Sequence, residues 1–92
     1  MAIEVRVPTI MRKHTGGAQK VSGAGATVRE VVDDLETRHA GLRDALVGDD
    51  GRLHRFVNVY VNDEDVRFLG GMETPLSDGD TVSILPAVAG GG

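Results

Sequence analysis

The sequence contains no cysteine and no tryptophan, and only one tyrosine and two phenylalanines occur among its 92 residues. Without cysteine, the chain has no disulfide, no thiolate metal ligand and no thiol nucleophile of its own. Hydrophobic residues make up 40% of the chain and aromatic residues 3%, so valine, leucine, isoleucine and alanine must form the core. A core of this size fits one small domain and leaves no room for a large buried cofactor.

Long hydrophobic runs are also missing, since no apolar stretch approaches the roughly 20 residues needed to cross a bilayer. The N-terminal segment lacks the basic region and the apolar stretch of a secretory signal peptide. We therefore expect a soluble, cytoplasmic protein. The formal net charge of -4 argues against nucleic acid as the main partner.

The charge is distributed unevenly along the chain. Residues 1–20 carry four basic side chains against one acidic side chain, whereas residues 62–80 carry six acidic side chains against one arginine. The acidic segment could steer a basic partner, or it could be a solvated loop region. The sequence leaves both interpretations open.

Recognisable catalytic and ligand-binding motifs are missing as well. The three histidines lie far apart, and Asp63-Glu64-Asp65 and Asp78-Gly79-Asp80 do not match the spacing of a calcium loop. Gly23-Ala24-Gly25 lacks the dinucleotide-binding spacing, and no P-loop is present. We therefore expect no catalytic residue, no metal site and no bound cofactor, and any ATP would bind a partner.

Two strands are predicted near the N-terminus. Residues 3–8 alternate between apolar and polar, which is the period of a half-buried strand. Residues 19–22 could return as the second strand of a hairpin, after a long loose turn in which Gly16 and Gly17 need positive φ. Residues 23–26 then read as a connector.

One amphipathic helix is predicted over residues 28–39. Thr27 and Glu30 have the spacing of a capping box, in which each side chain bonds a free amide of the first turn. The apolar residues that follow have helical spacing; they are Val28, Val31, Val32 and Leu35. Gly41 supplies a stop, and residues 42–46 could add one further turn.

The second half of the chain reads as strands. Residues 55–62 alternate, so that Val57, Val59 and Val61 would face the helix. Residues 66–69 are predicted as a short strand followed by a turn at Gly70-Gly71. Residues 81–86 form the last predicted strand, with Val82 and Ile84 inward and Ser83 and Leu85 outward.

The order of these elements predicts an α+β fold of the β-grasp, ubiquitin-like type. We expect a mixed sheet of four to five strands with one main helix on one face. The first strand would lie centrally and pair in parallel with the last. The domain would span residues 1–86, and residues 87–92 would form a flexible C-terminal tail.

This tail is the most informative feature of the sequence. It reads Val88, Ala89, Gly90, Gly91 and Gly92 directly after the last strand. Because glycine has no Cβ, such a segment can enter a narrow slot that larger residues would block. We expect the domain to present this terminus to the active site of another protein.

The chain resembles the ThiS/MoaD family of sulfur-carrier proteins, and the CysO type within it more strongly. The resemblance covers nearly the whole chain. It is carried by residues 7–10, 14–17, 53–68, 76 and 78–91, and its specific motifs are Val-Asn-Asp-Glu-Asp-Val-Arg and Leu-Pro-Ala-Val-Ala-Gly-Gly.

The resemblance implies a mechanism in which this chain is a carrier and not an enzyme. An E1-like enzyme of the MoeZ or MoeB type would use ATP to adenylate the terminal carboxylate, and a sulfur donor would convert it to a thiocarboxylate, a C-terminal 1-thioglycine. The family pattern usually stops at Gly-Gly, whereas a third glycine follows here. We therefore assign the reacting carboxylate to Gly92, or to Gly91 if Gly92 is removed.

The resemblance also implies partners for the charged carrier. For the CysO type these are a CysM-like PLP-dependent cysteine synthase and a Mec-like zinc peptidase. Similar carriers serve thiosugar, thiamin thiazole and molybdopterin synthesis. Two alternatives stay open, a ubiquitin-like modifier conjugated to lysines and a plain interaction module with an idle tail.

Partner docking is predicted on the sheet face away from the helix. Phe56, Tyr60 and Leu85 would form an apolar cluster there, left bare in a monomer. The alternative is that the loop at residues 11–20 partly covers them.

Overall fold

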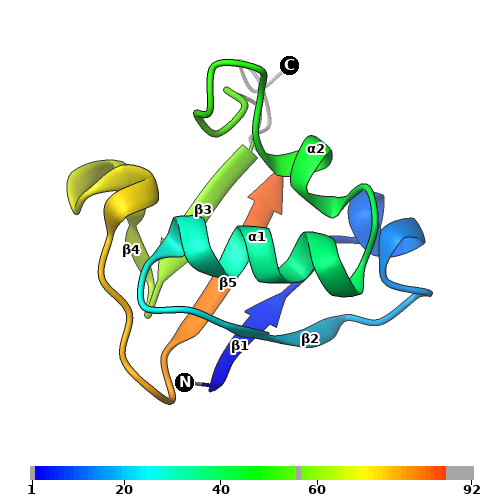
Figure 1. Cartoon of the computed structure of the whole chain (residues 1–92), viewed down its shortest axis with the longest axis horizontal. Helices are drawn as coiled ribbons and strands as arrows, with labels where there is room; N and C mark the ends of the chain where they lie inside the picture. Colours follow the sequence, from blue (N-terminus) through cyan, green and yellow to red (C-terminus); the bar gives the residue numbers. More distant parts are fainter. Residues whose placement is uncertain (1, 56, 87–92) are drawn as a thin grey trace.

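A five-stranded mixed sheet carries one long helix across one of its faces (Figure 1). The computed structural model describes residues 2–55 and 57–86. The strands are β1 Ala2–Arg6, β2 Lys20–Ala24, β3 Val57–Val61, β4 Glu64–Asp65 and β5 Thr81–Pro86. The α-helices are α1 Val28–Arg38 and α2 Leu42–Leu46, and the 3₁₀ turns are η1 Thr9–His14, η2 Val66–Phe68 and η3 Gly71–Glu73.

The order of strands in the sheet is β2-β1-β5-β3-β4. The first and last strands are parallel neighbours, with Val5 opposite Val82, while β1 and β2, β5 and β3, and β3 and β4 pair in antiparallel fashion. A mixed sheet of this order under a single main helix is the β-grasp fold. The predicted α+β class and the parallel pairing of the first and last strands are confirmed.

Helix α1 begins close to where the capping residues predict. The Thr27 side chain accepts a hydrogen bond from the Glu30 backbone N–H at 3.2 Å, as in a capping box. The reciprocal bond is displaced by one residue, because Glu30 Oε1 accepts from the Ala26 backbone N–H at 2.8 Å. Two amides at the start of the helix are therefore satisfied by side chains.

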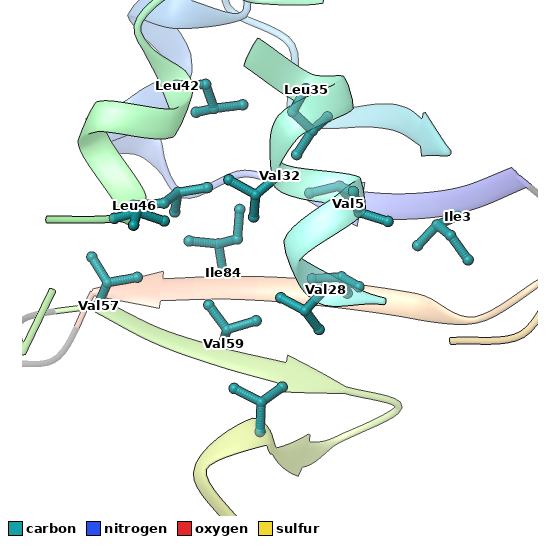
Figure 2. Packing of buried hydrophobic residues seen from close by; sticks show 14 of the residues in the cluster. Ile3, Val5, Val28, Val32, Leu35, Leu42, Leu46, Val57, Val59 and Ile84 are labelled. Carbon is teal, nitrogen blue, oxygen red and sulfur yellow. The ribbon is translucent and has the colours of Figure 1, made fainter. Parts of the chain in front are cut away.

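The core lies between α1 and the sheet (Figure 2). Ile84 at the centre of the sheet is 2% exposed, and Val59, which lies opposite it on β3, is 3% exposed. The apolar side of α1 covers them with the four residues predicted from helical spacing. Leu42 and Leu46 of α2 close one end of this core. The inward positions predicted for β3 and β5 are confirmed.

The short strand predicted over residues 66–69 is wrong. Residues 66–68 form the 3₁₀ turn η2, and the strand that pairs with β3 is Glu64–Asp65. A strand would place Val66 and Phe68 on one face, whereas Val66 is fully buried and Phe68 is 87% exposed. The Asp65 side chain starts the turn by accepting from the Arg67 backbone N–H at 2.9 Å.

Two other segments also differ from the prediction. Gly23 and Ala24, expected in a connector, complete β2, and a Cβ on Gly23 would come within 3.0 Å of Val31 Cγ1. Glycine there lets α1 approach the sheet closely. The loop expected after β1 contains the ordered turn η1, which buries Met11. The predicted tail, residues 87–92, lies outside the described residues.

Candidate functional site

The sheet face opposite α1, here called the open face, carries the side chains that alternate with the core residues. It includes Glu4, Arg6, Lys20, Asn58, Tyr60, Ser83 and Leu85. Burial alternates along β1, β3 and β5, which shows that these strands have one packed face and one accessible face. Side chains on the open face are therefore available to a partner.

One row of the open face crosses the whole sheet. Arg6 lies opposite Lys20 on one side and Ser83 on the other. Ser83 in turn lies opposite Tyr60, and Tyr60 lies opposite Asp65. The row therefore runs from two cations, through the hydroxyl groups of Ser83 and Tyr60, to a carboxylate at the far edge.

A hollow of about 680 Å³ lies on this face beside Tyr60 and Leu85. The other residues that border it are Arg6, Val7, Pro8, Arg12, Gln19, Lys20, Asp63, Ser83 and Ile84. Leu85 is 48% exposed within it. The hollow thus combines an apolar floor with a mainly cationic rim, a surface suited to a partner that offers apolar and acidic groups.

The structure brings two of the three predicted docking residues together. Tyr60 and Leu85 line the same hollow, whereas Phe56 lies outside the described residues. The loop that could have covered them borders the hollow instead. Its Arg12 Nε donates to the Val7 backbone carbonyl at 3.1 Å, and Leu85 is half-exposed.

Asp65 is held at the edge of the sheet by Arg67. Arg67 Nη2 donates to Asp65 Oδ2 at 2.7 Å and also to Asn58 Oδ1 at 2.8 Å. The hydrogen bonds from the Arg67 side chain and backbone hold the pKa of the Asp65 carboxyl below its usual value. Asp65 thus stays ionised as part of the fold.

Other carboxylates of the acidic segment are also used locally. Asp80 accepts from the Ser77 backbone N–H at 2.8 Å and from Asn62 Nδ2 at 3.0 Å, and these bonds lower the pKa of its carboxyl. Asp78 accepts from the Ala2 backbone N–H at 2.8 Å. The segment is built into turns, which favours the loop interpretation over a free acidic stripe.

Groups that could hold a metal ion do not occur within residues 2–55 and 57–86. None of the helices in these ranges is long and apolar enough to cross a membrane. The predicted tail residues Val88, Ala89, Gly90, Gly91 and Gly92 lie beyond the described part of the chain, which ends at the exposed Pro86 of β5.

Comparison with known proteins matches residues 5–91 to the ThiS family. The chain belongs to the ThiS family. It is 55% identical over 93 residues to the sulfur carrier protein CysO of Mycobacterium tuberculosis, covering 99% of this chain and 100% of CysO. It is also 47% identical over 66 residues to small archaeal modifier protein 3 of Haloferax volcanii, covering 72% of this chain and 71% of that protein.

Solved structures of relatives have the same fold as this ThiS-family protein. In the BexX/CysO complex of Amycolatopsis orientalis, the matching chain is 61% identical with a TM-score of 0.91, covering 97% of this chain and 99% of that chain. The ThiS-family resemblance and the similarity to the CysO type, both inferred from sequence motifs, are confirmed.

Sequence reasoning missed several exposed residues of this ThiS-family protein. Arg6, Arg12 and Lys20 border the predicted docking site, and Phe68 and Leu69 form an exposed apolar pair elsewhere. The sequence contained a signal for these three cations, because residues 1–20 carry most of the positive charge in the first half of the chain. Only the pairing of β1 with β5 shows that this charge lies beside Tyr60.

Proposed function

We propose that this ThiS-family protein is a sulfur carrier whose C-terminal glycine carboxylate is converted to a thiocarboxylate. The observation that carries the proposal is the similarity, over 99% of the chain, to proteins named sulfur carriers or putative sulfur carriers. The hollow beside Tyr60 and Leu85 supports the proposal, since a carrier needs a surface that a partner protein binds.

The proposed chemistry proceeds in two steps. A carboxylate is a poor electrophile, so an E1-like enzyme of the MoeZ or MoeB type transfers AMP from ATP to the Gly92 carboxylate and releases pyrophosphate. Hydrosulfide, or an equivalent sulfur donor, then attacks the acyl carbon and AMP leaves. The product is a thiocarboxylate with a nucleophilic sulfur. If Gly92 is removed first, the same steps take place at Gly91.

The fold would contribute recognition and placement. Leu85 of the docking hollow directly precedes Pro86, the last residue of β5. A partner that binds Leu85 therefore contacts the chain two residues before residue 87, where the proposed tail begins. The glycines lack Cβ atoms and fit a narrow channel to an active site.

For the acceptor, we propose a synthase that takes the sulfur into a biosynthetic product. The CysO-type relatives favour cysteine, with a CysM-like PLP-dependent synthase as acceptor and a Mec-like zinc peptidase releasing the product. Docking onto a partner protein is supported by the BexX/CysO complex, which contains a relative 61% identical to this chain. Transfer to a thiosugar, to thiamin thiazole or to molybdopterin is the alternative fate of the same sulfur.

A second candidate function is conjugation to other proteins. The similarity to a small archaeal modifier protein favours it. Activation would be the same, but a lysine amine would attack the acyl group instead of a sulfur donor. The two functions therefore differ only in the nucleophile that displaces the activating group.

Intact-mass measurement separates these functions. The protein is incubated with the E1-like enzyme, ATP and hydrosulfide. A sulfur carrier gains the mass difference between one sulfur and one oxygen atom, whereas a modifier forms ladders on other proteins. A variant lacking Gly91 and Gly92 is the control, and it should show neither change. If the full chain and the variant lacking Gly91 and Gly92 give the same result, this would support a tail without a function.

A further inference from the structure

A second hollow lies on the helix side of the sheet, away from the docking face. Its volume is about 410 Å³, and it opens between the segment at residues 51–55 and the turns η2 and η3. Apolar side chains form its floor; they are Leu53, Val57, Val59, Val66 and Met72. We call this hollow the β3 groove, because two valines of β3 lie at its base.

Arginines surround the β3 groove. Arg29 pairs with Glu73 at 2.6 Å, and Arg67 pairs with Asp65 at 2.7 Å. Arg52 and Arg55 also line the groove, and both are exposed without an ion pair to any residue in the described ranges. The rim is therefore cationic, although the whole chain has a formal net charge of -4.

The β3 strand leaves part of its outer edge open beside this groove. β4 pairs only with Tyr60 and Val61, and the Val57 backbone N–H already donates to the His54 carbonyl at 3.0 Å, so residues 58–59 have no strand partner on that side among the residues described. An unpaired strand edge can accept an extended peptide as an added strand.

We propose that the β3 groove binds an extended, acidic peptide segment of a partner protein. Apolar side chains of the segment enter the groove over Val57 and Val59, its backbone pairs with the open edge of β3, and its carboxylates face Arg52 and Arg55. The proposal goes beyond sulfur transfer, because this groove lies on the opposite side of the sheet from Tyr60 and Leu85. Both sites can therefore be occupied at once.

The test uses the full chain labelled with ¹⁵N and a synthetic peptide, acetyl-Asp-Glu-Leu-Val-Leu-Asp-Glu-amide. We expect saturable shifts of the amide signals of Arg55, Val57, Val59 and Gly71, with little change at Ser22 of β2. The control peptide replaces every acidic residue by lysine. It should not bind, because it would place cations against a cationic rim.

Matched variants assign the binding to this groove. The double variant Arg52→Glu/Arg55→Glu should bind the acidic peptide at least about tenfold more weakly, a loss of about 1.4 kcal/mol. Lys20→Glu, an exposed charge reversal at the other side of the sheet, should bind it normally. Both variants change exposed side chains, and their amide spectra report whether the fold is kept.

Three results would overturn the proposal. The first is the absence of amide shifts at peptide concentrations up to about 1 mM, the range of a very weak interface. The second is a set of shifts centred on Tyr60 and Leu85. The third is equal binding of the acidic peptide and the lysine peptide. Methylation of the central valine nitrogen of the peptide should abolish binding, and equal binding of the methylated form would overturn the added-strand geometry. Sulfur loading is measured separately and should be unchanged in Arg52→Glu/Arg55→Glu.

Discussion

Pro86, the last residue of β5, lies directly opposite Val57, the first residue of β3. The pairing of the two strands therefore continues to the last residue that the structure describes. The hollow on the open face thus holds a fixed relation to Pro86.

Leu85 provides the most selective test of the docking face. Leu85→Asp should lower kcat/KM for sulfur loading by the E1-like enzyme about tenfold, because a carboxylate would have to be buried in the interface. The fold should be kept, since Leu85 is 48% exposed in the free protein. The control is Phe68→Asp, an apolar side chain that is 87% exposed away from the hollow. Equal loading rates for the two variants would show that the open face does not bind the enzyme.

Ile84 tests the core at the centre of the sheet. Ile84→Ala should lower the free energy of unfolding by about 2–5 kcal/mol, because it removes buried methyl and methylene groups and leaves a cavity. Ile10→Ala is the matched control, and since Ile10 is 63% exposed its cost should stay within about 0.5 kcal/mol. Urea denaturation measures both. A small loss for Ile84→Ala would mean that the core is packed differently.

The ionisation of the Asp65 carboxyl should make the free energy of unfolding depend on pH. Arg67 lowers the pKa of this carboxyl in the folded protein below its ordinary value of 3.8. The contribution of the ionised Asp65 carboxylate to the free energy of unfolding should be fully present at a pH above its unfolded-state pKa. It should be lost as the pH falls through the lower folded-state pKa. Asp65→Asn should therefore be less stable than the parent at neutral pH, and the difference should shrink in acid.

Urea denaturation between neutral and strongly acidic pH checks this dependence. Glu4→Gln is the control, because Glu4 and Arg6 form an exposed pair that should contribute little at any pH. A difference between Asp65→Asn and the parent that stays constant down to strongly acidic pH would contradict the role of Arg67.

The sequence predicts the fold well wherever burial follows a simple period. Thr81–Pro86 matches the structure from end to end, and α1 begins at the residue that the cap at Thr27 predicts. Val57, Val59 and Val61 are all buried, as their alternation indicates. In these elements, local propensity and tertiary packing favour the same conformation.

The prediction fails where a side chain bonds its own backbone. The Asp65 cap turns the chain into η2 after only two paired residues, although Val66 and Phe68 suggest a strand.

The cationic rim of the docking hollow was also missed. Arg6 and Tyr60 are far apart in the sequence, and they come close only through the places of β1, β5 and β3 in the sheet.

The most direct test of the carrier proposal locates the sulfur atom within the chain. After loading with ATP, the E1-like enzyme and hydrosulfide, the protein is digested and its C-terminal peptide is fragmented in a mass spectrometer. We predict that the added mass falls on the last residue, Gly92, or on Gly91 if the chain has been trimmed. Sulfur found elsewhere in the chain, or an unmodified C-terminal peptide after full consumption of ATP, would contradict the carrier mechanism.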